Sequence, residues 1–93
     1  MNLEQLATKY INSAKHVLEH VEMVHASMTV DVDRVRQVVQ CAKNYLNDAE
    51  HYGEKKKFEV SLTSVAYCEG LMDALRLLGA VRFEWSKTKK SEN

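Results

Sequence analysis

The sequence has no proline and only three glycines among its 93 residues. These two residues form most tight turns, so their scarcity argues against many short β-strands joined by turns. Two cysteines, Cys41 and Cys68, are too few for a disulfide scaffold, and we expect both thiols to be free and largely packed. The chain is 45% hydrophobic and 28% charged, which is typical of a folded domain. A chain of this length can build one hydrophobic core.

The sequence also lacks a net charge and a long hydrophobic run. Thirteen basic residues balance thirteen acidic ones, so no overall electrostatic field attracts nucleic acid or an anionic membrane. No stretch approaches the roughly 20 apolar residues that a membrane-spanning helix needs, and the N-terminus does not resemble a signal peptide. These absences predict a cytoplasmic protein that does not act in a membrane.

Hydrophobic residues near the N-terminus recur at three- and four-residue steps, the spacing that places them along one face of an α-helix. The residues with this spacing are Leu3, Leu6, Ala7, Tyr10, Ile11, Ala14, Val17, Leu18, Val21 and Val24. They predict a helix over about residues 2–26, which the side chain of Asn2 can cap.

Two further segments show the same period. The first contains Val32, Val35, Val38, Val39, Ala42, Tyr45, Leu46, Ala49 and Tyr52, after a cap at Thr29 or Asp31 and before a left-handed stop at Gly53. The second begins near Phe58, after a charged turn over 54–57, and its apolar residues continue to Val81 on two adjoining sides. A mid-helix glycine costs roughly 1 kcal/mol relative to alanine. Gly70 inside this helix therefore suggests that another helix or side chain approaches closely, and the alternative is surplus flexibility at this position.

Three helices with apolar stripes and short connections predict an all-α fold, an antiparallel (up-down-up) three-helix bundle with the third helix in the centre. We expect residues 1–85 to form this single domain. The last eight residues, 86–93, contain no large apolar side chain, so we expect a disordered polar tail.

Two segments, 44–52 and 65–79, carry a resemblance to a known family. The matching residues are Tyr45, Asp48, Ala49 and Tyr52 in a YxxDAxxF-like stretch, and Tyr67, Gly70, Leu71, Asp73 and Ala74 in a YAxGLLDA-like stretch. In this respect the sequence resembles a short archaeal family catalogued as domain of unknown function 357. The resemblance covers roughly the C-terminal two-thirds of the chain. It implies a compact helical bundle from an archaeal cytoplasm, and it brings no established activity.

Tyr45, Asp48, Tyr67 and Asp73 form the candidate ligand-binding residues, at the junction of the second and third helices. Two partly buried phenols need hydrogen-bond partners, and two carboxylates stand near them in the expected packing. One interpretation is structural hydrogen bonding. The other is a small polar pocket that holds a ligand, and it depends mostly on the family resemblance.

Other polar clusters do not define a catalytic or metal site. His16 and His20 are one helical turn apart, but no third ligand is fixed by spacing, so we expect a solvated pair and no metal or other cofactor. Glu69, Asp73 and Arg76 share one face of the third helix, which predicts an intrahelical ion pair on a solvated face. The alternative is half of a carboxylate metal or acid–base site, which would need ligands from Asp48, Glu50 or His51 on the second helix. Because the sequence has no phosphate-binding GxxxxGK loop, no GxSxG nucleophile motif and no Cys–His pair at an informative spacing, we expect a protein that is not an enzyme.

Runs of lysine over 55–57 and 87–90 lack the aromatic residues that commonly accompany them in nucleic-acid sites, which makes nucleic acid an unlikely partner.

The apolar residues at the end of the third helix and beyond it exceed what two partner helices need to cover. Leu77, Phe83 and Trp85 are therefore the candidate interface residues, as anchors for another surface. The remaining apolar surface should meet the chain's own C-terminal segment, a second copy of the protein or a different protein. The sequence predicts a non-enzymatic protein–protein interaction or oligomerisation module, with a second copy (a homodimer) or another protein as partner. The alternative is a small ligand- or metal-binding protein with its polar site between the second and third helices.

Overall fold

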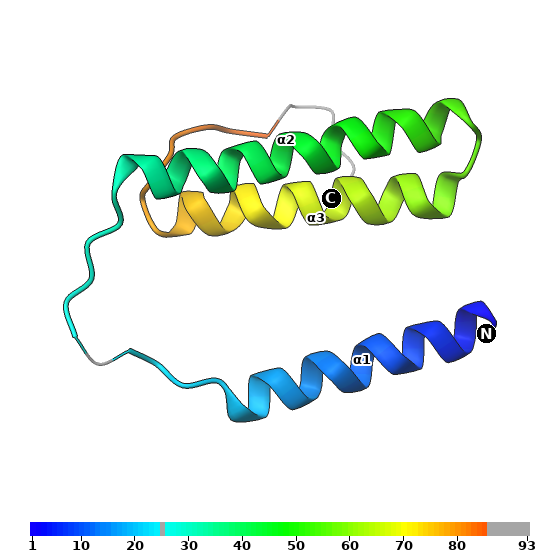
Figure 1. Cartoon of the computed structure of the whole chain (residues 1–93), viewed down its shortest axis with the longest axis horizontal. Helices are drawn as coiled ribbons and strands as arrows, with labels where there is room; N and C mark the ends of the chain where they lie inside the picture. Colours follow the sequence, from blue (N-terminus) through cyan, green and yellow to red (C-terminus); the bar gives the residue numbers. More distant parts are fainter. Residues whose placement is uncertain (25, 86–93) are drawn as a thin grey trace.

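The computed structural model describes residues 1–24 and 26–85 and contains three α-helices over these ranges, without a strand. They are α1 (Leu3–His20), α2 (Val32–Glu54) and α3 (Phe58–Leu77) (Figure 1). The predicted all-α class is confirmed. The expected tail over 86–93 lies outside the described residues.

Helices α2 and α3 form an antiparallel hairpin, and they lie side by side along their lengths (Figure 1). The side chains buried at their contact are Ala42 and Ala49 of α2 and Leu75 of α3. The two alanines let the backbones approach closely, so that the Ser61 hydroxyl of α3 donates a hydrogen bond of 2.7 Å to the Ala49 carbonyl of α2. This hairpin contains all of the hydrophobic core found in the described residues.

The turn between α2 and α3 differs from the prediction at Gly53. This residue remains helical, and the left-handed backbone conformation occurs at Lys56, which has a φ of 61°. A Cβ atom at position 53 would lie 3.4 Å from the Ser61 hydroxyl oxygen. The prediction of a left-handed stop at Gly53 is therefore wrong, and the glycine instead leaves room for the close contact with α3.

Helix α3 ends in a Schellman motif that reverses the chain. Gly79 has a φ of 76°, its N–H donates to the Arg76 carbonyl at 3.0 Å, and the N–H of Ala80 donates to the Leu75 carbonyl at 2.9 Å. Residues 80–85 then run back along the hairpin (Figure 1). The third helix is thus shorter than the predicted apolar stripe, which continues to Val81.

Helix α1 lies apart from the hairpin, and within the described chain it packs against neither α2 nor α3 (Figure 1). It begins as predicted, with a capping box in which Asn2 and Gln5 bond each other's backbone N–H groups at 2.8 and 3.1 Å. It ends at His20, so the prediction of a helix to residue 26 is wrong. The next residue, Val21, has extended backbone angles. Without tertiary contacts, the β-branched Val21 and Val24 do not favour a further helical turn.

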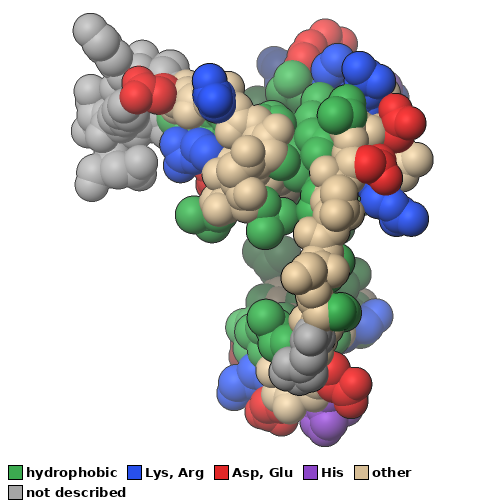
Figure 2. All heavy atoms as spheres, turned by 90° about the vertical axis from the view of Figure 1, so that its left-hand side faces the viewer, with side chains coloured by type: hydrophobic (Ala, Val, Ile, Leu, Met, Phe, Trp, Pro, Cys, Tyr) green, Lys and Arg blue, Asp and Glu red, His purple; other side chains and the backbone are tan. Residues whose placement is uncertain are grey.

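The predicted three-helix bundle is not confirmed. Helix α1 runs antiparallel to α2, with its N-terminus at the end where α2 and α3 are joined, but the residues of its apolar face are exposed. Hydrophobic side chains gather on the sides of α1 and of the hairpin that face each other, whereas the charged side chains lie mostly on the outer sides (Figure 2). Helix α1 therefore has the orientation expected for an up-down-up bundle, but it does not pack against the other two helices.

We predict that the stability of the fold depends on the α2–α3 contact and hardly at all on the exposed end of α3. Leu75 is 4% exposed, so Leu75→Ala should lower the free energy of unfolding by about 2–3 kcal/mol. The matched control is Leu77→Ala, because Leu77 is 86% exposed, and its effect should stay below about 0.5 kcal/mol. Urea denaturation followed by circular dichroism, at a concentration that keeps the chain monomeric, measures both. Equal losses for the two variants would contradict this assignment of the core.

Candidate functional site

Tyr45 of α2 and Tyr67 of α3 meet at the junction of the two helices. Their rings stack with centroids 4.3 Å apart and planes inclined by 25°. Tyr45 is half-buried, whereas Tyr67 is 54% exposed. The neighbouring Tyr67 phenol, followed by the partial burial of the ring, raises the pKa of Tyr45 above its ordinary value, so the stack favours the neutral phenol.

Asp48 lies one helical turn from Tyr45 on α2, and its side chain is exposed. The negative charge of Asp48 adds a small upward contribution to the pKa of Tyr45. The structure therefore brings together three of the four predicted ligand-binding residues. Their chemistry is that of two stacked aromatic rings with a carboxylate at the margin.

Asp73, the fourth predicted residue, belongs to a different cluster. One of its carboxylate oxygens accepts a hydrogen bond of 2.8 Å from the Trp85 indole N–H and lies 3.6 Å from an Arg76 guanidinium nitrogen. The Arg76 guanidinium stands 5.0 Å from the centre of the Phe83 ring, which meets the Trp85 ring edge to face with centroids also 5.0 Å apart. We call Asp73, Arg76, Phe83 and Trp85 the C-terminal clasp, because they hold residues 80–85 against the hairpin.

The clasp separates the three predicted interface residues. Phe83 and Trp85 are half-buried against their own chain, whereas Leu77 projects into solvent. Contact of the C-terminal segment with the rest of its own chain was one of the alternatives that the sequence left open, and Gly79 directly after α3 was a signal that the chain could turn back there. The pairing of Asp73 with Trp85 was not predicted.

A shallow apolar hollow of about 250 Å³ lies on α3 beside the tyrosine stack. It is lined by Tyr67, Gly70 and Leu71. A Cβ atom added at Gly70 would meet no neighbouring atom within 4 Å, so this glycine borders open space. The close neighbour that the sequence predicts for Gly70 is not provided by the α2–α3 hairpin.

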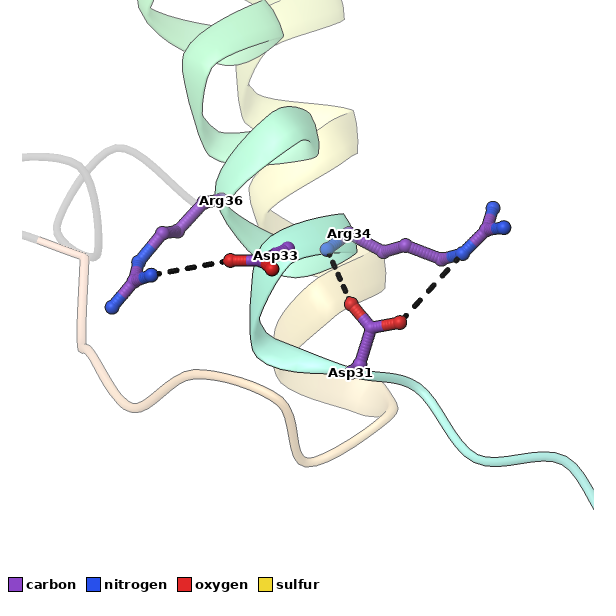
Figure 3. Close-up of polar contacts among 4 residues, drawn as sticks. All are labelled: Asp31, Asp33, Arg34 and Arg36. Atoms are coloured by element: carbon purple, nitrogen blue, oxygen red, sulfur yellow. Dashed lines mark hydrogen bonds and ion pairs between the residues drawn. The ribbon is translucent and has the colours of Figure 1, made fainter.

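A second hollow, of about 410 Å³, follows the N-terminal half of α2. Its lining residues are Val32, Val35, Arg36, Val39, Gln40 and Lys43. Arg36 is engaged with Asp33 at 3.3 Å, and the neighbouring Arg34 lies 3.9 Å from the helix cap Asp31 (Figure 3). These local ion pairs neutralise part of the positive charge at this end of α2.

The histidines and cysteines that the structure describes form no larger cluster. The rings of His16 and His20 lie 4.3 Å apart, and His20 Nδ1 is 2.8 Å from the His16 carbonyl oxygen, a hydrogen bond within α1. Cys41 and Cys68 are free thiols, and burial raises the pKa of Cys68. Among the described residues no three His, Cys, Asp or Glu side chains are grouped closely enough to hold a metal ion. No helix in the same ranges is long and apolar enough to cross a membrane.

We predict that the clasp can be followed through Trp85, the single tryptophan of the chain. Asp73→Asn weakens the acceptor of the indole N–H and removes the charge that holds Arg76, so the emission of Trp85 should shift to longer wavelength and its quenching by acrylamide should increase. The control is Asp33→Asn, which removes the same charge from a surface pair on α2. Unchanged emission in Asp73→Asn would contradict the clasp.

Comparison with known proteins gives one match. The model of a family described as protein of unknown function (DUF357) matches residues 9–81, a range that includes most of α1 as well as the whole hairpin. No curated protein and no solved structure gives a significant match. The resemblance seen in segments 44–52 and 65–79 is therefore confirmed and extends toward the N-terminus. Because the match spans more than half of the chain, the chain belongs to the DUF357 family.

Proposed function

We propose that this protein is a non-enzymatic helical interaction module that associates with a second copy of itself. The observation that supports the proposal is the apolar face of α1, which has no partner within the described chain. Exposed contiguous apolar surface is unfavourable in water and marks interaction sites. Most of the stability of a helix in a protein comes from the packing of its amphipathic face, so α1 needs a packing partner to persist.

The proposed association completes the up-down-up arrangement that the sequence predicts. In that arrangement α1 packs against the side of α3 that faces away from α2, which makes α3 the central helix. The orientation of α1 supports this, because it already runs antiparallel to α2 with its apolar side toward the hairpin (Figures 1 and 2).

Leu77 is the predicted anchor best placed to take part in the association. It is exposed at the end of α3, whereas Phe83 and Trp85 are engaged in the clasp. We propose that Phe83 and Trp85 contribute indirectly. They hold the C-terminal segment against the hairpin, next to the exposed surface at the end of α3 where Leu77 lies.

We predict that a charge on the apolar face of α1 weakens self-association. Val17 is 58% exposed on this face, and Val17→Glu should weaken the dimer at least tenfold, because a carboxylate would have to be desolvated on association. Asn12→Glu adds the same charge on the opposite face of α1 and should change the affinity less than twofold. Light scattering during size-exclusion chromatography, over a wide concentration range, measures the mass. A mass that stays at the 10.7 kDa of one chain would overturn the proposal.

A second candidate is the binding of a small ligand between α2 and α3. The observation that favours it is the Tyr45–Tyr67 stack beside the apolar hollow at Gly70, with Asp48 at the margin. A ligand that binds there should raise the melting temperature of the wild-type protein and not that of Tyr67→Ala. A metabolite screen without any stabilising compound, together with a metal analysis showing no bound metal, would remove this candidate.

A further inference from the structure

We propose that the dimer forms by exchange of α1, so that the apolar face of α1 from one copy packs over Gly70 on α3 of a second copy. The inference rests on the self-association proposed above and specifies which surfaces meet. In this dimer a second copy of the chain covers the exposed side of α3.

The receiving surface is the outer side of α3, defined by Leu62, Ala66, Gly70 and Leu77. These residues point away from Leu75, the α3 residue buried against α2, and all four are exposed. Small residues at the centre of this side, with leucines toward its two ends, allow another helix to approach closely at Gly70. The apolar hollow beside Gly70 is the space that a side chain of such a helix would fill.

The donating surface is the apolar face of α1 and of the residues directly after it. Its exposed large residues are Leu3, Leu6, Tyr10, Ile11, Val17, Leu18, Val21 and Val24. If each contributes on the order of 100 Å², together they offer about the 800 Å² per partner that a stable interface needs. An exchange forms this contact twice, so the area is sufficient for a dimer.

The connection between α1 and α2 favours exchange over closure within one chain. Eleven residues separate His20 from Val32, whereas helix connections in bundles commonly have about 2–8 residues. The segment begins in an extended conformation at Val21 and carries α1 away from its own hairpin (Figure 1). At about 3.3 Å per residue, it can reach roughly 36 Å, enough to place α1 on a neighbouring copy. An extended hinge between a detached element and the remaining body is the geometry that domain exchange uses.

The charges permit the contact. α1 carries two acidic and two basic side chains, in addition to its two histidines, whereas α3 carries three acidic side chains and one basic one. The neutral helix therefore meets the acidic one without repulsion between net charges of like sign.

The direction of α1 sets the register. Figure 1 shows that α1 and α3 run the same way and begin at the same end of the molecule. Ala14 is the twelfth residue of α1 and Gly70 the thirteenth of α3, so equal helical rise brings them level. An exchanged dimer forms between two copies the same contacts that a monomer with α1 packed on its own hairpin would form within one chain. Ala14 of one copy should therefore lie at Gly70 of the other.

Cysteine cross-linking between two differently tagged chains tests the exchange. One full-length chain carries Ala14→Cys and the other Gly70→Cys, both with Cys41→Ala and Cys68→Ala to remove the native thiols. Mild oxidation should join the two chains at least tenfold faster than it joins Gly70→Cys to Asn12→Cys, the control on the opposite face of α1. If Gly70→Cys is not helical, Tyr10→Cys with Ala66→Cys repeats the test one turn earlier.

A single chain that carries both Ala14→Cys and Gly70→Cys distinguishes exchange from closure. A covalent dimer supports exchange. A disulfide within one chain overturns it, and self-association is then judged by the mass in solution alone. A dimeric mass without an Ala14–Gly70 cross-link also overturns exchange, because the copies then meet elsewhere. A monomeric mass at every concentration overturns both proposals.

Discussion

The close contact between α2 and α3 is the interaction on which the rest of the structure depends. Two buried alanines on α2 bring the helices together, Leu75 fills the space between them, and the Ser61 hydroxyl fixes the register by its bond to the Ala49 carbonyl. Because Leu75 faces α2, helical geometry places Gly70 and Leu77 on the outer side of α3. The same contact stacks Tyr45 on Tyr67. The hairpin therefore determines which apolar residues are buried and which remain available to a partner.

The exposed α1 is the main departure from a closed monomer, and it connects the fold to the proposed function. Its capping box and amphipathic pattern are sufficient to define a helix, but burial supplies most helical stability in proteins. The eleven-residue connection is long enough for α1 to reach the hairpin of a neighbouring copy, and its length favours this over packing on its own hairpin. The same apolar stripe of α1 is therefore compatible with a three-helix monomer and with an exchanged dimer.

The hydrophobic period in the sequence was enough to predict three helices, and the polar residues before them gave the cap at Asn2 and a choice of Thr29 or Asp31 for the next cap, of which the structure uses Asp31. These features depend on residues near each other in the chain. The end of α1 and the conformation of Gly53 could not be predicted, since the first depends on absent tertiary packing and the second on the nearby Ser61. Among the candidate site residues, the meeting of Tyr45 and Tyr67 followed from pairing α2 with α3. The partner of Asp73 did not, because Trp85 reaches it only after the chain turns back at Gly79. A periodic pattern shows which face of α1 is apolar, but it does not show what covers that face.

Hydrogen–deuterium exchange at several protein concentrations tests most directly the central claim, that the hairpin is stable by itself and α1 is stabilised by association. Amides in the centres of α2 and α3 should be protected at every concentration, whereas those of α1 should exchange rapidly in dilute solution and become protected as the concentration rises. Protection of α1 that is equally strong at the lowest concentration would contradict the account, because α1 would then be packed within its own chain.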